Sequence, residues 1–256
     1  MIAYGTCIGS DERFARFTEP GIVRAAGPEP VVLKRWEQTS LFAGYNSILD
    51  EARELPDLEA LVLLHDDTEL RDAGFEAKVR ELFSDPSIGL AGAVGASHVT
   101  SLAWWEGECH GRASYNGPPG GGLRIVDFGT ETVDVDCVDG YLLVLSPWVV
   151  GHLRFDDQTF HGFDGYGVDL GFSVRRAGKR VVVSDFPHHH HGRTRTLLGF
   201  RLANVRWRAK WGFDSKLMVP ARLAWIRVRA KLGSARRRLR SKLTRPATPR
   251  GASPPW

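Results

Sequence analysis

The sequence predicts an α/β fold built on a mixed, mostly parallel sheet with helices on both faces, and three observations support this prediction. Apolar runs alternate with helical patterns through residues 1–97, in the order strand, helix, strand, helix, strand. One run, Leu58–His65 (LEALVLLH), is predominantly apolar, as expected of a central parallel strand that is buried on both faces. The 256 residues, of which 43% are hydrophobic, suffice for one large domain with its own core.

Four segments of the first half are rich in apolar residues and are expected to be strands: Ile2–Ile8, Glu29–Lys34, Leu58–His65 and Ile88–Val94. A polar loop is expected after the first strand, at Gly9–Glu12. Two helices are expected between the later strands. The first begins at Thr39–Ser40 and ends before Pro56, and the second spans Phe75–Phe83. This alternation favours a sheet with right-handed crossovers.

The second half begins with a long excursion, His98–Asp134, which is rich in glycine, proline and aromatic residues and contains a glycine cluster at Gly117–Gly122. An excursion of this kind is usually a functional lid or disordered. Regular structure is then expected as strand Val135–Leu145, helix Leu170–Ala177, strand Arg180–Ser184 and helix Arg201–Trp211. From Arg245 the chain is rich in proline, serine and glycine and is expected to be disordered.

Charge divides the chain into an acidic body and a basic tail. Residues 216–256 contain twelve Lys or Arg residues and no Asp or Glu, so the net charge of +4 leaves residues 1–215 at −8. We therefore expect a main domain at residues 1–213 and a basic amphipathic or disordered tail at residues 214–256.

Several features favour the reducing cytoplasm as the location. No run of about 18 apolar residues is present, so no transmembrane helix is expected. The N-terminus lacks the charged and apolar regions of a signal peptide. The three cysteines, Cys7, Cys109 and Cys137, are scattered and indicate neither a CxxC pair nor a disulfide framework.

Acidic residues follow the central strand directly, in the segment His65-Asp66-Asp67-Thr68-Glu69. In open α/β sheets, ligands bind outside the carboxyl ends of the strands. Two adjacent carboxylates are unfavourable there unless a cation or hydrogen-bond donors compensate them. A divalent ion bridging a diphosphate would supply that compensation. The alternative is a surface turn made of acidic residues.

Two further segments carry acidic residues near predicted strands and helices. Asp139-Gly140 precedes an apolar strand, and such a pair by itself is usually a turn. Asp164 and Asp169 flank a loop of glycine and aromatic residues just before a predicted helix. Asp169 fits either a helix N-cap or a general base at the mouth of a cleft.

Four consecutive histidines, His188–His191, follow a predicted strand and precede Gly192. The run is internal, so we do not interpret it as a purification tag. Either one imidazole completes a metal site or the four side chains are solvated in a loop. Mg²⁺ prefers oxygen ligands, whereas Mn²⁺ tolerates a mixed oxygen and imidazole shell, so the expected cofactor is a divalent ion, Mn²⁺ or Mg²⁺.

Taken together and in this order, the motifs resemble glycosyltransferase family 2, and more narrowly its StrF-like branch, from roughly Ile2 to Gly192. Six segments carry the resemblance together with the terminal histidine–glycine pair: AGYN at Ala43–Asn46, HDDTEL at His65–Leu70, IGLAGAVG at Ile88–Gly95, WWEG at Trp104–Gly107, VDGYLLV at Val138–Val144 and YGVDLGFSVRRAGKRV at Tyr166–Val181.

This resemblance implies a GT-A fold in one continuous sheet, with a nucleotide-binding half at residues 1–97 and an acceptor-binding half at residues 98–213. It implies a metal-dependent hexosyltransferase that acts with inversion. The donor would be a nucleotide-diphosphate sugar, and the acceptor a hydroxyl of a carbohydrate, a lipid-linked molecule or a small molecule.

The resemblance also implies roles for individual residues. Asp67 matches the usual metal ligand, and the histidine ligand maps to His189 or His190, with the register of the run ambiguous. The first acid of the family's acidic triplet is replaced here by His65. The residues expected to bind the nucleotide sugar are Thr6, Cys7, Asn46, Asp66, Asp139 and Gly140.

One departure from the family concerns the general base. Many relatives carry an acid where this sequence has Gly167. The candidates for the base are therefore Asp169, favoured because it begins the predicted helix, and Asp164. The departure also motivates a different class, a non-catalytic sugar-nucleotide-binding or membrane-surface protein of the same fold. A sugar-nucleotide pyrophosphorylase or hydrolase is disfavoured, because the segment after the first strand lacks a GxxxxGK phosphate loop.

The acceptor is expected to meet an aromatic loop. Trp104 and Trp105 are expected to stack on a sugar face or on an apolar acceptor, and the alternative is that both tryptophans pack in the core. Flanking glycines suggest that this loop orders when the donor binds.

The basic tail has apolar residues at roughly helical spacing among its arginines and lysines: Trp225, Val228, Leu232, Leu239 and Leu243. A basic amphipathic helix at residues 220–245 suits an anionic membrane surface, which would place the protein at the inner face of the cell membrane. A solvated tail is the alternative. Nucleic acid ranks last as a partner, because no recognised nucleic-acid fold accompanies the segment.

Overall fold

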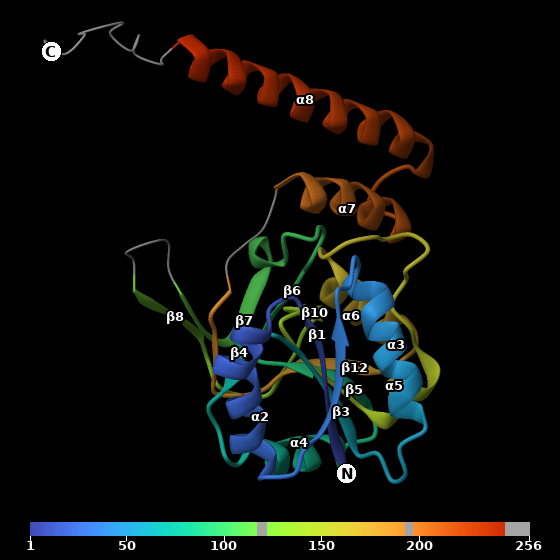
Figure 1. Ribbon diagram of the computed structural model, residues 1–256. Coiled ribbons are helices and arrows are strands. Elements are labelled where there is room, and N and C mark those ends of the chain that lie inside the picture. The colour runs from blue at the N-terminus through green and yellow to red at the C-terminus, as the bar shows by residue number, and fades with distance from the viewer. Residues whose placement is uncertain (117–121, 193–196, 244–256) are drawn as a thin grey trace, which may run out of the picture.

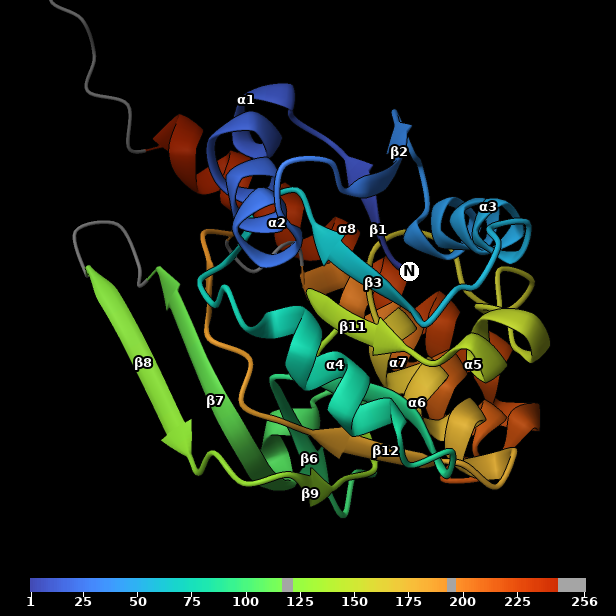
Figure 2. The ribbon, with the colours of Figure 1, turned by 90° about the horizontal axis from the view of Figure 1, so that it is seen from below.

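The computed structural model describes residues 1–116, 122–192 and 197–243, with side chains described up to residue 231. The chain folds into two sheets with helices packed around them, and not into the one continuous sheet that the resemblance implies (Figures 1 and 2). The glycines at 117–121 within the predicted cluster, and the predicted disordered end from Arg245, lie outside the described residues.

The larger sheet has seven strands in the order β2-β1-β3-β11-β5-β12-β9. Their bounds are β2 (Val31–Trp36), β1 (Ile2–Ile8), β3 (Ala60–His65), β11 (Leu142–Leu145), β5 (Ile88–Gly92), β12 (Arg180–Val183) and β9 (Val133–Asp134). β1 is parallel to β2 and β3, and β12 is parallel to β5, whereas β11 is antiparallel to β3 and β5, and β9 to β12. Five strands therefore run in one direction and two in the other, which confirms the predicted mixed, mostly parallel sheet.

The central strands are buried on both faces, and alternate residues enter two different cores. In β3, Leu61 and Leu63 belong to one core, and Val62 and Leu64 to the other. The first core also contains residues of α3 (Leu41–Arg53), α5 (Pro147–His152), α6 (Tyr166–Arg176) and α7 (Leu197–Lys210). The second contains residues of α2 (Glu19–Ala26) and α4 (Phe75–Phe83). Figure 2 shows these two groups of helices on opposite sides of the sheet.

The helical segment before β2 begins directly after β1. α1 (Asp11–Arg13), a π-helical stretch (Phe14–Thr18) and α2 form one run, which Ser10 caps by accepting a hydrogen bond from the Arg13 backbone N–H at 3.3 Å. The predicted polar loop at Gly9–Glu12 is therefore shorter than expected, since its second half already belongs to this helix.

The smaller sheet has the order β10-β6-β7-β13-β4, and β8 pairs with β7 outside this path. Its strands are β10 (Cys137–Val138), β6 (Val94–Ser97), β7 (Glu108–Asn116), β13 (His188–His190), β4 (Thr68–Leu70) and β8 (Leu123–Phe128). The predicted excursion at 98–134 therefore contains the β7–β8 hairpin, which projects from the body in Figure 1, and the short 3₁₀ helix Trp104–Glu106.

Two predicted strands are each split between the two sheets. Ile88–Val94 ends its run in the larger sheet at Gly92, and Val94 starts β6 in the smaller one. Val135–Leu145 is likewise interrupted at Asp139–Tyr141, between β10 and β11. Gly92 allows the chain to pass close to β10 as it leaves the larger sheet, because a Cβ at position 92 would lie only 2.6 Å from the Val138 Cβ.

The basic tail forms a long helix, α8 (Val219–Leu243), which follows the 3₁₀ turn Lys216–Met218 and packs beside α7 before it extends past the body (Figure 1). Across the described ranges, no helix combines the length and apolar character needed to cross a bilayer.

Candidate functional site

The acidic motif lies where β3 ends, and two hydrogen bonds fix that strand end. Cys7 of β1 lies opposite His65, the last residue of β3, in the parallel register. The His65 backbone N–H donates to the Tyr141 carbonyl at 3.1 Å, and Thr18 Oγ1 donates to the His65 carbonyl at 2.9 Å. Because both bonds restrain His65, the Asp66–Asp67 turn follows a defined course into β4.

Strand β13 brings the histidine run against this turn. β13 pairs antiparallel with β4, with His190 opposite Thr68, and the His191 backbone N–H donates to the Asp67 carbonyl at 2.8 Å. Successive residues of a strand point to opposite faces. His190 therefore points toward Asp67, while His189 and His191 point to the other face.

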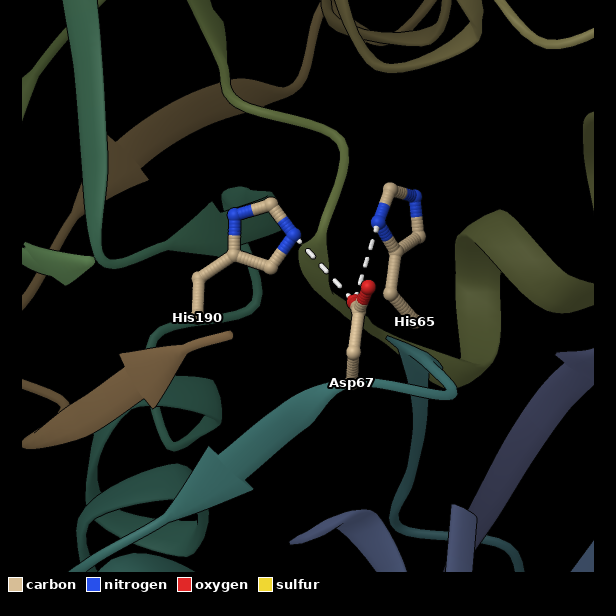
Figure 3. A group of neighbouring side chains, drawn as sticks. All are labelled: His65, Asp67 and His190. Carbon is tan, nitrogen blue, oxygen red and sulfur yellow. Dashed lines mark ion pairs between the residues drawn. The ribbon is translucent and has the colours of Figure 1, made fainter. Parts of the chain in front are cut away.

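Three side chains meet at this point: His65, Asp67 and His190 (Figure 3). Asp67 Oδ1 lies 3.2 Å from His190 Nε2 and 3.9 Å from His65 Nδ1. One donor atom from each residue lies within 4.8 Å of the other two. The predicted convergence of Asp67 with a histidine of the run is thus present, and His65 joins it.

The Asp67 carboxylate is 7% exposed, and its buried Oδ1 pairs with the His190 imidazole at 3.2 Å. Burial acts to raise the pKa of Asp67, but His190, His65 and Arg13 outweigh it and lower the pKa to about 2. The carboxylate is therefore buried and charged, between two imidazoles that face its Oδ1.

This donor set fits the divalent ion that the resemblance implies. Asp67 Oδ1 is a buried oxygen that a cation would satisfy, and imidazole nitrogens with a carboxylate oxygen are common ligands of divalent transition-metal ions. The residues placed to hold such an ion are Asp67 and His190, with His65 beside them.

Two tyrosines support the imidazoles. The Tyr141 ring stacks on His190, with centroids 4.6 Å apart and an interplanar angle of 18°. The Tyr166 hydroxyl is hydrogen-bonded to His65 Nε2. Tyr166 can approach because residue 140 is glycine, where a Cβ would lie 2.5 Å from the tyrosine ring.

Gly192 lies directly against the site. A Cβ at this position would come within 2.6 Å of both Asp67 Oδ2 and His190 Nε2. The histidine–glycine pair of the sequence therefore has a steric reason, because any side chain at position 192 would displace one of the two candidate ligands.

Asp66 holds the loop that follows β1. Its Oδ2 accepts hydrogen bonds from the backbone N–H groups of Gly9 and Ser10 and from Arg13 Nη2, each at 2.8 Å. These donors compensate the charge of Asp66, so the two adjacent carboxylates of the motif are stabilised in different ways. Arg13 also brings a positive charge close to Asp67.

Asp139 and Gly140 lie close to the same cluster. Asp139 Oδ1 accepts from the Gly140 backbone N–H at 2.7 Å. Burial raises the pKa of Asp139, and the nearby His190 acts in the opposite direction. The structure therefore places this carboxyl within electrostatic reach of His190.

His189 and Asn46 are held in other contacts. His189 is hydrogen-bonded through Nδ1 to Ser114 Oγ at 2.6 Å and through Nε2 to Asn116 Oδ1 at 2.9 Å. Asn46 donates to the Phe155 carbonyl and accepts from the Phe155 backbone N–H, both at 2.9 Å. Of the two predicted histidine ligands, the structure brings His190 to Asp67 and leaves His189 on the other face.

Thr6 and Cys7 lie at the end of β1, next to β3. Thr6 is fully buried, and its Oγ1 lacks a hydrogen-bond partner within the described part of the chain. Cys7 is half-buried and packs against α3, where a Cβ at Gly44 would lie 2.6 Å from its Sγ. Burial raises the pKa of the Cys7 thiol to about 12, so the thiol is neutral at physiological pH.

The two predicted bases have different surroundings. Asp169 is 2% exposed and accepts hydrogen bonds from Lys210 Nζ at 2.7 Å and from Trp211 Nε1 at 2.8 Å. Burial raises the pKa of Asp169, while Lys210 and Trp211 oppose the shift. Asp164 is half-buried in the loop before α6. Burial raises the pKa of Tyr166, and the negative charge of Asp164 raises it further.

The two tryptophans of the aromatic loop also differ. Trp104 is half-buried and packs against both cores. Trp105 is 54% exposed and stacks on Phe200 of α7, with centroids 5.7 Å apart and an interplanar angle of 27°. Trp104 therefore serves core packing, whereas Trp105 presents an open aromatic ring.

Sequence reasoning did not identify His65, Tyr166 or Arg13 as site residues. For His65 a signal was present, since it occupies the place of an acid two positions before Asp67. Tyr166 belongs to a segment that carries the resemblance, but its role and that of Arg13 could not be read from the sequence, because their contacts with His65 and Asp66 depend on how α6 and α1 pack.

Comparisons with known proteins identify the family of the chain. The model of the glycosyltransferase like family matches residues 26–194. The streptomycin biosynthesis protein StrF of Streptomyces griseus is 36% identical over 251 residues, which cover 91% of this chain and 87% of that protein.

Two solved structures share the fold at low sequence identity. The mannosyltransferase PcManGT of Pyrobaculum calidifontis, in complex with GDP-Man and Mn²⁺, has a TM-score of 0.52 and 11% identity, over 91% of this chain and 75% of that chain. GalNAc-T7 with UDP, GalNAc and Mn²⁺ has a TM-score of 0.51 and 9% identity, over 79% of this chain and 47% of that chain. From the matched segment, the StrF relative and the shared GT-A fold, the chain belongs to the glycosyltransferase like family, in its StrF-like branch.

Proposed function

We propose that the protein transfers a hexosyl group from a nucleotide-diphosphate sugar to an acceptor hydroxyl, with inversion at the anomeric carbon. The observation that carries the proposal is the meeting of Asp67 and His190 at the carboxyl end of β3. The two solved glycosyltransferases of this fold contain Mn²⁺ with UDP or GDP-Man, which supports a nucleotide-sugar donor and a divalent ion here.

In this proposal Asp67 and His190 hold the divalent ion under the donor diphosphate. The ion, when bound, offsets the negative charge that grows on the leaving diphosphate. Asp66 keeps the loop at Gly9–Arg13 beside the nucleotide, and Thr6 and Cys7 line the pocket of the base. Asp139 and Gly140 lie against the donor sugar.

The acceptor hydroxyl needs a carboxylate to take its proton as it attacks the anomeric carbon. We assign this role to Asp164 ahead of Asp169. Asp164 lies within electrostatic reach of Tyr166, which contacts His65, whereas both oxygens of Asp169 accept hydrogen bonds from Lys210 and Trp211 in the core. The open ring of Trp105 is proposed to stack on the acceptor, supported by Phe200.

The experiment that tests the activity uses the full chain with Mn²⁺ and a panel of uridine, guanosine and thymidine diphosphate sugars. Release of nucleoside diphosphate and sugar transfer to simple acceptors are measured, and NMR identifies the product anomer. We expect turnover that Asp67→Ala and His190→Ala abolish. Donor binding without turnover across the panel would favour the non-catalytic alternative, and a product with retained configuration would reject inversion.

We also propose that α8 attaches the protein to an anionic membrane surface, at the inner face of the cell membrane. Among the side chains of α8 that the structure describes, the partly buried positions are Val219, Leu223, Ile226 and Ala230. Trp225 and Val228 lie on the opposite side, 59% and 54% exposed. Four basic residues flank this exposed apolar strip: Arg222, Arg227, Arg229 and Lys231. An apolar strip flanked by cations suits an interface with acidic lipids.

A further inference from the structure

We propose that His65 is a third ligand of the ion site, that Tyr166 holds it in the ligating tautomer, and that the site therefore binds Mn²⁺ in preference to Mg²⁺. This inference rests on the ion site of the proposed function and extends it to the class of ion. Tyr166 acts here as a positioning residue, because it contacts a ligand and not the ion.

The geometry places three donors around one point. Asp67 Oδ1 is buried and faces His190 Nε2 at 3.2 Å and His65 Nδ1 at 3.9 Å (Figure 3). The imidazole rings of His65 and His190 stand on either side of it, with centroids 5.5 Å apart. A lone buried carboxylate oxygen between two imidazoles is an arrangement that a cation stabilises.

Tyr166 determines which nitrogen of His65 carries the proton. A neutral imidazole has one donor nitrogen and one acceptor nitrogen. His65 Nε2 is hydrogen-bonded to the Tyr166 hydroxyl. When Nε2–H donates to that oxygen, the lone pair of His65 belongs to Nδ1, which faces Asp67. A ligating histidine commonly has such a partner on its other nitrogen.

Packing fixes Tyr166 in this position. The residue is buried, and its ring packs roughly perpendicular to that of Tyr45, with ring centroids 5.4 Å apart. It also fills the space that a side chain at Gly140 would occupy. The His65–Tyr166 contact is therefore held by the core and does not depend on a mobile surface group.

The donor set predicts the class of ion. Mg²⁺ prefers oxygen ligands in a strict octahedron and gives up its water reluctantly. Imidazole ligands suit transition-metal ions such as Mn²⁺ better. Because two of the three side chains are imidazoles, replacing the family's first acid by His65 shifts the site away from Mg²⁺.

The test titrates the full chain with Mn²⁺ or Mg²⁺ alone, without nucleotide or acceptor, by calorimetry. The variants are His65→Asp and Tyr166→Phe, with His152→Asp on α5 as a matched control outside the site. We expect the wild type and the control to bind Mn²⁺ at least about tenfold more tightly than Mg²⁺. His65→Asp should lower this ratio about tenfold, and Tyr166→Phe should weaken Mn²⁺ binding by about tenfold or more.

A spectroscopic measurement separates ligation from a general structural effect. Electron spin-echo envelope modulation of bound Mn²⁺ reports the number of nitrogen atoms that coordinate the ion directly. Two histidine nitrogens are expected in the wild type and one in His65→Asp, and the wild-type spectrum alone decides the matter if that variant fails to fold. One nitrogen in the wild type, an unchanged ion preference in His65→Asp, or no Mn²⁺ binding would each overturn the proposal.

The result is independent of sugar transfer. Two coordinated nitrogens in a protein without transferase activity would support this inference and count against the proposed function. Sugar transfer by a protein whose ion has a single coordinated nitrogen would support the proposed function and overturn this inference.

Discussion

Gly167 of α6 packs directly on Gly140: a Cβ at position 167 would lie 2.7 Å from the Gly140 Cα and 2.9 Å from its backbone nitrogen. The neighbour is backbone and cannot rotate away, so this packing leaves no room for an acidic side chain. The departure from the family pattern at Gly167 therefore accompanies the close contact that brings Tyr166 to His65.

The first prediction concerns this contact. Gly167→Ala should lower the free energy of unfolding by about 1–3 kcal/mol, because the new methyl group overpacks the α6–Gly140 contact. Urea denaturation measures the change. Gly151→Ala in α5 is the matched control, because a Cβ there meets nothing within 4 Å, and it should leave stability unchanged or raise it by up to about 1 kcal/mol. Equal behaviour of the two variants would contradict the packing argument.

The second prediction separates the two candidate bases. Asp164→Asn should reduce kcat by about 100-fold or more, since it removes the group proposed to accept the proton. Asp169→Asn should instead cost about 1–3 kcal/mol of stability, because it weakens the bonds to Lys210 and Trp211. Kinetics and thermal melts of both variants measure this. Loss of turnover in Asp169→Asn alone, at unchanged stability, would reverse the assignment.

The third prediction concerns Gly192. Gly192→Ala should weaken Mn²⁺ binding by about tenfold or more, because its Cβ would press on Asp67 Oδ2 and His190 Nε2. Calorimetric titration measures the affinity, and Gly151→Ala is again the control. Wild-type affinity in Gly192→Ala would mean that the ion, if it binds, lies elsewhere.

The helical run at residues 11–26 was not predicted, but several of the large strands and helices were, from continuous or helically spaced apolar residues. β3 and α4 are examples, since each presents a clear pattern of buried residues. β4 and β13 carried no such signal: each has three residues, and their pairing depends on partners about 120 positions apart in the chain. The sequence therefore predicted that Asp67 meets a histidine but left the register of the run open.

The side-chain contacts of the site were harder to predict for the same reason. Asn46 belongs to a motif that the resemblance assigns to the nucleotide sugar, yet its hydrogen bonds hold the backbone of Phe155. Asp169 was expected to begin a helix, but α6 begins three residues earlier, at Tyr166, and only the packing of α7 reveals Lys210 and Trp211 beside Asp169. Contacts between elements that are remote in sequence leave no periodic pattern in either segment, so they cannot be predicted from the sequence of one segment alone.

The fourth prediction concerns the tail. Trp225→Ser should reduce flotation with vesicles that contain acidic lipid, because it removes the largest group of the exposed strip on α8. Ile125→Ser in β8, also an exposed apolar residue, is the matched control and should float like the wild type. Binding should weaken as salt rises, since the cations of the helix are screened. Flotation that is insensitive to Trp225→Ser and to salt would reject the membrane proposal.

The most direct test of the whole account is the binding of nucleoside diphosphates with and without Mn²⁺, measured by titration for the wild type, Asp67→Ala and His190→Ala. We predict that binding requires the ion and that each substitution removes the part of the affinity that depends on the ion. Nucleoside diphosphate binding of equal strength in the presence of a chelator, or in both variants, would contradict the claim that Asp67 and His190 hold an ion beneath the donor.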